Sequence, residues 1–191
     1  MQELLEKLEQ WLRLNKPEYL SRLQCGLTLK EIEDLATPLS LRLPEEIVQL
    51  YQWRNGSEAS GDNFFLIYRF LPLREAIEDT LHLRKDAEAY PLFESNDRKM
   101  GFPNYYDWQY HWFSIFYEVK DRIAMVIGDN PSAYAPIIIT CGENSWTELW
   151  FKSLKGFISA ILECYETELY LLEDFCLDDA EEIWAKYRDL V

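Results

Sequence analysis

The sequence predicts a single-domain α+β protein in which helices pack around a mostly antiparallel, possibly mixed, central sheet. Three observations point to this class. The 191 residues suffice for one sizeable domain, and 48% of them are apolar against 28% charged, a balance typical of globular proteins. Helical periodicity dominates both ends of the chain, and short apolar runs typical of strands lie between them. No repeat or long linker is visible, so we expect residues 1–191 to form one domain.

Three helices are predicted in the N-terminal third. An apolar face at helical spacing marks the first. This face consists of Leu4, Leu5, Leu8, Trp11 and Leu12. Thr28 and Glu31 form a capping-box pattern, which predicts a second helix ending near Pro38. Residues 43–51 predict a third helix with Pro44 in its first turn, and Asn55-Gly56 should end it in a left-handed conformation.

The middle of the chain carries the strand signals. The run 64–70 predicts a strand, and Pro72 should begin a further helix. Residues 112–119 and 123–127 predict an antiparallel hairpin around the turn Lys120-Asp121-Arg122, and 136–141 and 146–151 add further strands. Ser153 is a predicted N-cap for the helix that follows, and a last helix should begin at Asp178.

Charge and cysteine content bound the function. There are 34 acidic and 19 basic side chains, a net charge of −15, which opposes binding to nucleic acids or anionic membranes and favours a basic partner protein, unless acidity serves solubility alone. The four cysteines lack metal-site spacing, so we expect buried free thiols. The N-terminus does not resemble a signal peptide, and no apolar run approaches the roughly 20 residues of a membrane span. We therefore expect a cytoplasmic protein.

One set of residues resembles a known family, the SUKH superfamily of Smi/Knr-type cell-wall regulators and bacterial immunity proteins. The residues that carry the resemblance are Leu43, Pro44, Ile47, Leu50, Tyr51, Asn55 and Gly56, for which we expect structural roles. The resemblance implies an α+β fold over about residues 28–170, with 1–27 as an N-terminal helical extension and 171–191 as an acidic C-terminal helix. It also implies a non-catalytic domain that binds and neutralises or modulates a partner protein, for example a basic nuclease toxin.

An acidic face with nearby aromatic side chains is the predicted partner-binding surface, because rim charges steer association and a few aromatic residues carry most of the affinity. The residues assigned to it are Glu58, Asp62, Tyr105, Tyr106, Trp108, Asp178, Asp179, Glu181 and Glu182.

Signals for catalysis are sparse. The only two histidines, His82 and His111, are interpreted as structural, and no phosphate-binding or nucleophile motif is present. Adjacent acids such as Glu45-Glu46 are explained by helix starts and solvated faces. We therefore predict no enzyme activity, no catalytic residue, no cofactor and no metal. The alternative is an enzyme or small-ligand binder that uses the aromatic stretch 102–112 with a nearby carboxylate.

Overall fold

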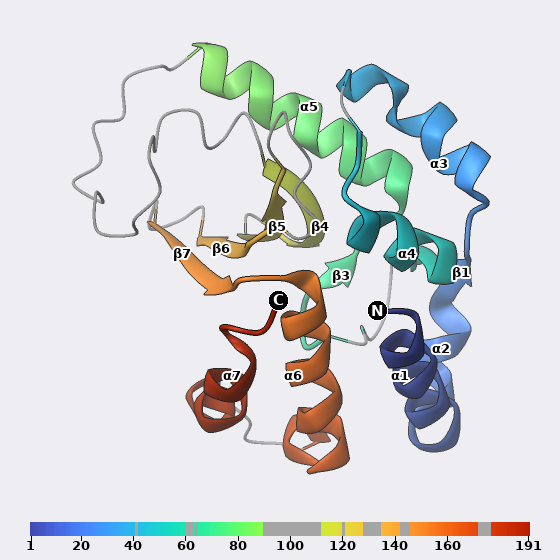
Figure 1. The fold of residues 1–191 in the computed structure, drawn as a ribbon, viewed down its shortest axis with the longest axis vertical. Coiled ribbons are helices and arrows are strands. Elements are labelled where there is room, and N and C mark those ends of the chain that lie inside the picture. The colour runs from blue at the N-terminus through green and yellow to red at the C-terminus, as the bar shows by residue number, and fades with distance from the viewer. Residues whose placement is uncertain are drawn as a thin grey trace.

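A computed structural model describes residues 1–40, 42–59, 63, 65–89, 112–119, 121–127, 135–141, 146–171 and 177–191 (Figure 1). The α-helices of this part are α1 (Gln2–Asn15), α2 (Pro17–Arg22), α3 (Leu29–Ala36), α4 (Glu45–Trp53), α5 (Leu73–Ala89), α6 (Leu154–Glu166) and α7 (Glu181–Tyr187). The strands are β1 (Leu23–Cys25), β2 (Arg54–Ser57), β3 (Arg69–Phe70), β4 (Trp112–Glu118), β5 (Asp121–Val126), β6 (Ile137–Cys141) and β7 (Trp146–Phe151). Short 3-10 helices are η1 (Thr37–Leu39), η5 (Leu169–Leu171) and η6 (Leu177–Ala180). The α+β class is confirmed.

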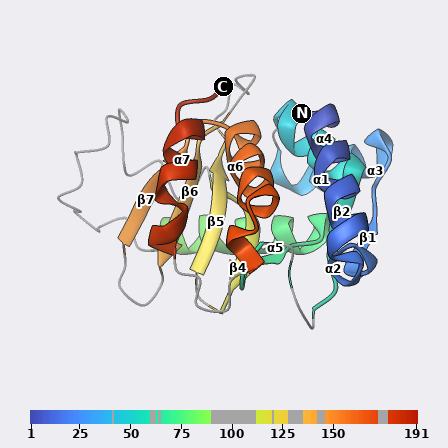
Figure 2. The same cartoon turned by 90° about the horizontal axis from the view of Figure 1, so that it is seen from below.

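The main sheet is a five-stranded meander in the order β3-β4-β5-β6-β7, and each described pair of neighbours is antiparallel. Helix α5 covers one face, and α6 and α7 cover the other (Figures 1 and 2). On the α5 side, Leu83 packs against Trp112 and Ala124. On the α6 side, the ring centroids of Phe157 and Phe116 lie 5.7 Å apart. The sheet is thus buried between two helical layers.

The N-terminal residues share the core of the rest of the chain. The predicted amphipathic helix is α1, whose Leu5, Leu8 and Leu12 are buried. Trp11 stacks on Tyr165 of α6 with a centroid distance of 4.6 Å. Helix α2 and strand β1 were not predicted, and β1 pairs antiparallel with β2 in a small second sheet. The N-terminal segment therefore packs on α6 and is not a separate arm.

Two predicted helix starts are confirmed by their hydrogen bonds. The Glu31 N–H donates to Thr28 Oγ1 at 3.3 Å, and the Thr28 N–H donates to the Glu31 carboxylate at 2.7 Å, which completes the capping box of α3. The Gly156 N–H donates to Ser153 Oγ at 2.9 Å at the start of α6. Both caps act within three residues, so the local sequence was sufficient to predict them.

The predicted strand over 64–70 is wrong for most of its described length. Leu66 has a left-handed φ of 51°, and the Tyr68 N–H donates to the Phe65 carbonyl at 3.0 Å, so the chain turns back on itself. This turn buries both aromatic rings and leaves Ile67 exposed at its tip. Only Arg69 and Phe70 pair with β4.

Two other boundaries differ from prediction. Glu118 pairs with Asp121, so Asp121 and Arg122 belong to β5 and not to the hairpin turn. The reason is tertiary, because Arg122 is held in the strand by Asp79 of α5 through contacts of 2.8 and 3.0 Å. The last helix begins at Glu181, after a 3-10 turn that buries Ala180, and not at Asp178.

Candidate binding groove

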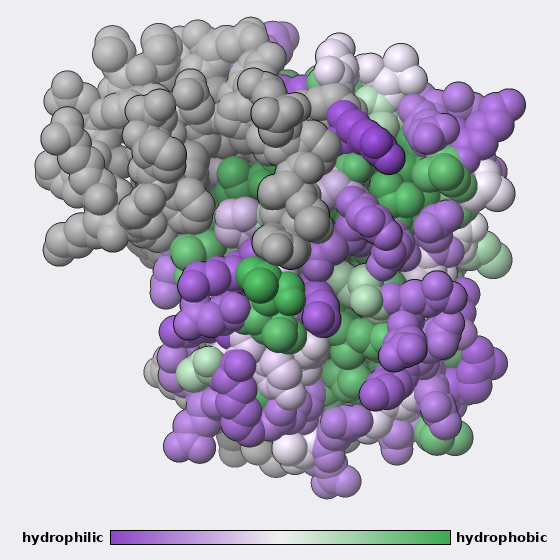
Figure 3. All heavy atoms as spheres, viewed as in Figure 1, coloured by the Kyte–Doolittle hydropathy of each residue, from purple (hydrophilic) through white to green (hydrophobic). Residues whose placement is uncertain are grey.

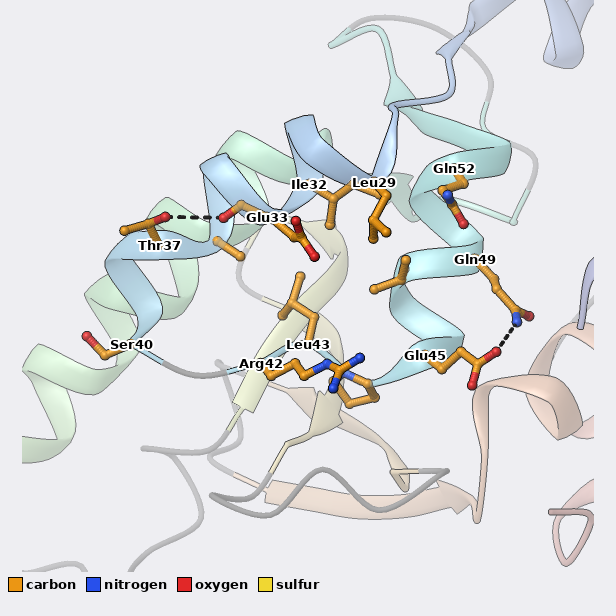
Figure 4. A pocket seen from close by; sticks show the side chains of 13 residues that line it. Leu29, Ile32, Glu33, Thr37, Ser40, Arg42, Leu43, Glu45, Gln49 and Gln52 are labelled. Atoms are coloured by element: carbon orange, nitrogen blue, oxygen red, sulfur yellow. Dashed lines mark hydrogen bonds between the residues drawn. The ribbon is translucent and has the colours of Figure 1, made fainter.

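A groove of about 680 Å³ lies between α3 and α4 (Figure 4). Its lining comes from both helices and from the segment that connects them. The lining residues are Leu29, Ile32, Glu33, Ala36, Thr37, Ser40, Arg42, Leu43, Pro44, Glu45, Val48, Gln49 and Gln52.

The floor of the groove is apolar. Ile32 and Ala36 of α3 and Leu43 of the connecting segment are buried, and Val48 of α4 is half-buried. Figure 4 shows Leu29, Ile32 and Leu43 pointing into the space between the two helices. The apolar side chain of Leu29 is 49% exposed to solvent. Figure 3 shows apolar side chains at the surface in this region, surrounded by hydrophilic ones. An apolar floor of this kind suits a partner's apolar side chains.

The rim is polar and mainly acidic. Glu33 and Glu45 are exposed, and the Gln49 amide donates to the Glu45 carboxylate at 2.8 Å. Arg42 supplies the basic group among the lining residues. The exposed carboxylates and amides surround the floor with hydrogen-bond acceptors and negative charge.

A second, smaller hollow of about 360 Å³ lies on the other side of α4, against α1. Gln49 and Gln52 line both hollows. Glu6 of α1 adds another exposed carboxylate there. The outer face of α4 is therefore a polar ridge between two depressions.

Five of the seven predicted motif residues lie just before α4 or in its first two turns, and two of them, Leu43 and Pro44, line the groove. Pro44 is the N-cap of α4 and is buried with Leu43 in the groove, so the helix begins at Glu45, two residues later than predicted. Ile47 and Leu50 are fully buried beneath it. The Tyr51 hydroxyl donates to the Leu71 carbonyl at 3.1 Å, and burial raises the pKa of Tyr51 above its ordinary value. The motif thus fixes α4 to the core.

Asn55 and Gly56 also have structural roles, but not the predicted one. Helix α4 ends at Trp53, and both residues lie in β2. Asn55 Oδ1 accepts from the Leu73 N–H at 2.9 Å, which caps the start of α5. Gly56 has the expected left-handed φ, 76°, and a Cβ there would lie 2.2 Å from the Pro72 nitrogen. The pair therefore joins β2 to α5, a contact that the sequence did not indicate.

Glu46 lies in the first turn of α4, as the predicted helix start requires, but its side chain is buried and does not belong to a solvated face. The side chain is only 9% exposed. Its two carboxylate oxygens accept from the N–H groups of Leu154 and Lys155, each at 3.1 Å, at the start of α6. Burial raises the pKa of Glu46 above its ordinary value, although the two backbone donors act in the opposite direction. The contact spans 108 residues of sequence, so no local pattern could have indicated it.

Comparison with known proteins identifies this arrangement. The model of the SMI1/KNR4 family (SUKH-1) matches residues 26–160, which include the groove and all seven motif residues. The chain belongs to the SMI1/KNR4 family. It is also 36% identical over 58 residues to the F-box protein SKIP16 of Arabidopsis thaliana. That stretch is 30% of this chain and 13% of the F-box protein, so the similarity covers only a small part of the F-box protein.

The residues predicted to bind a partner do not meet in one described patch of this SMI1/KNR4 domain. Glu58 is exposed, and its N–H donates to the Arg22 carbonyl beside α2. Asp179, Glu181 and Glu182 are exposed around the start of α7, on the other side of α6 (Figure 2). Glu181 already contacts Arg188 at 2.6 Å. The backbone of Asp178 is in η6, and Asp62, Tyr105, Tyr106 and Trp108 lie outside the described residues.

The histidines and cysteines complete the set of residues considered for chemical roles. His82 is exposed on α5, whereas His111 and residues 102–111 of the aromatic stretch fall outside the described residues, so the alternative ligand site stays a prediction. Trp112, the last residue of that stretch, is buried in β4. Within the described ranges, no group of three or more His, Cys, Asp or Glu side chains could hold a metal ion. Cys164 is buried as expected, but Cys25 is exposed because it lies on the small two-stranded sheet. None of the described helices has the length and apolar character needed to span a bilayer.

Proposed function

We propose that this SMI1/KNR4 domain is a non-catalytic immunity or regulatory module that binds a basic partner protein, such as a nuclease toxin, and neutralises or modulates it. The observation that carries the proposal is the groove between α3 and α4. It combines an apolar floor with an acidic rim, it lies within the range that the family model matches, and two of the predicted motif residues, Leu43 and Pro44, line it. A surface of this kind serves recognition, because burial of apolar area supplies affinity and rim charges supply selectivity.

The charge of the chain supports the same choice of partner. A net charge of −15 accelerates encounter with a basic protein and slows encounter with an acidic one or with nucleic acid. A toxin that cleaves nucleic acid carries a basic surface for its substrate, so an acidic binder is complementary to that surface. Covering it would inhibit the toxin without any reaction in the binder.

The test uses the intact chain as bait in the native host, followed by reconstitution with the purified partner. We expect a complex whose dissociation constant rises at least about tenfold between about 50 and 500 mM salt, with most of the change in the association rate. If the partner is a nuclease, a stoichiometric amount of this chain should abolish its activity. A partner that is acidic, or an affinity that does not change with salt, would contradict the proposal.

A further inference from the structure

The walls of the groove restrict the kind of segment that can occupy it. Both walls are α-helices, so beyond the terminal turns their backbone N–H and C=O groups are already bonded within each helix. An extended peptide laid on the apolar floor would bury backbone groups without finding partners for them on the walls, which is costly. A helical segment carries its backbone hydrogen bonds with it and offers only side chains.

The shape and composition of the floor fit one face of such a helix. Leu29 and Ile32 on α3 point toward the space between the helices, as does Leu43 of the connecting segment (Figure 4). Val48 of α4 also lines this space. Apolar side chains at positions i, i+3, i+4 and i+7 of an entering helix would cover this strip. Leu29, half exposed at one end, is then buried by the partner.

The rim sets the charge of the residues that flank this face. Glu33 stands on one wall and Glu45 on the other, with Glu6 in the neighbouring hollow, against a single guanidinium at Arg42 among the groove's lining residues. Basic side chains on an entering helix would meet carboxylates on both sides.

We propose that the groove between α3 and α4 binds a basic amphipathic helix of the partner protein. This inference rests on the proposed function and specifies which surface performs it and which kind of segment it recognises.

The test uses a fluorescein-labelled model peptide of about 18 residues, with leucines on one helical face and lysines on the other, and a second peptide with glutamates in place of the lysines. Binding to the intact chain is followed by fluorescence anisotropy at about 50 mM salt. We expect the lysine peptide to bind and the glutamate peptide to bind at least about tenfold more weakly.

Two pairs of variants locate the site. Glu33→Lys with Glu45→Lys should weaken binding of the lysine peptide about tenfold, whereas Glu181→Lys with Glu182→Lys on α7 adds the same charge and should change it less than twofold. Leu29→Ala should weaken binding about threefold, and the matched variant Leu14→Ala, at a leucine 73% exposed on α1, should not. Circular dichroism checks that each variant is folded.

Equal weakening by the two lysine double variants would show that only net charge matters and would overturn the groove assignment. Failure of the peptide to bind, or no effect of Leu29→Ala, would also overturn it. The same double variants applied to the reconstituted partner complex separate the two proposals. If the α7 variant alone breaks that complex, the binding function stands at another surface and the groove inference fails. If no partner binds the wild-type chain, the proposed function itself fails.

Discussion

Removal of the buried carboxylate of Glu46 tests how α4 is joined to the start of α6. The first three N–H groups of α6 have no acceptors within their own helix, as at any helix start. Glu46 accepts from two of them, at Leu154 and Lys155, and Ser153 Oγ accepts from the third, at Gly156. The substitution Glu46→Ala leaves two buried donors without an acceptor.

The expected loss follows from these contacts. A buried donor left without an acceptor costs about 1–3 kcal/mol. Glu46→Ala leaves two such donors, the N–H groups of Leu154 and Lys155. Part of this cost is offset because the folded chain no longer buries a carboxylate. We therefore expect Glu46→Ala to lower the free energy of unfolding by about 2–4 kcal/mol, which corresponds to about 6–12 °C in melting temperature for a chain of this length. Glu46→Gln keeps one acceptor and should lose about 1–2 kcal/mol.

Urea unfolding followed by tryptophan fluorescence measures these differences at neutral pH. The control is Glu45→Ala, the adjacent carboxylate in the same first turn of α4, which is exposed and accepts only from the Gln49 side chain. It removes the same interaction with the helix dipole and should cost less than about 0.5 kcal/mol. Equal losses for Glu45→Ala and Glu46→Ala would refute the argument, because the dipole and not the contact with α6 would then explain them.

The pH dependence of this contact has a definite sign. Burial raises the pKa of Glu46 above its ordinary value of 4.5, so folding favours the protonated form more than unfolding does. The contribution to stability is therefore largest below about pH 4.5 and declines as the pH rises through the raised value. Because glutamine does not titrate, the stability gap between wild type and Glu46→Gln should narrow from pH 4 to pH 7. A gap that widens over this range would contradict the prediction.

Three further substitutions test the other structural contacts. Asn55→Ala should lower the melting temperature by an amount equivalent to about 1–2 kcal/mol, because the Leu73 N–H loses its cap, whereas Asn55→Asp retains an acceptor and should remain near wild type. Gly56→Ala should cost more than about 2 kcal/mol in urea unfolding, since alanine is strained at a φ of 76° and its Cβ meets Pro72; a smaller loss would show that the backbone relaxes. Lys186 and Tyr187 donate to Glu163 and hold its pKa below its ordinary value, so wild type should lose stability relative to Glu163→Gln as the pH falls below about 4.5. Parallel pH profiles for the two proteins would exclude this contribution.

The candidate groove could be anticipated only in part. Leu43, Pro44 and Ile47 of the predicted motif are buried, and Leu43 and Pro44 also line the groove. The opposite wall comes from α3, whose packing against α4 depends on tertiary contacts. The Leu27 N–H donates to the Tyr51 carbonyl at 2.9 Å, which fixes the start of α3 near the end of α4. No spacing within either helix specifies that contact.

Helix caps and amphipathic faces, which depend on residues close together in the chain, were determined by the sequence alone. The capping box at Thr28, the N-cap at Ser153 and the buried face of α1 were all predicted, because each depends on side chains within one or two helical turns. The tertiary structure alone decided which partners the polar side chains near the ends of helices and strands contact. Asn55 caps α5 instead of ending α4, Glu46 reaches α6, and Arg122 joins β5 through Asp79. The partner of each group lies on a segment distant in the sequence. A buried polar group needs a partner, and the fold determines which one is within reach.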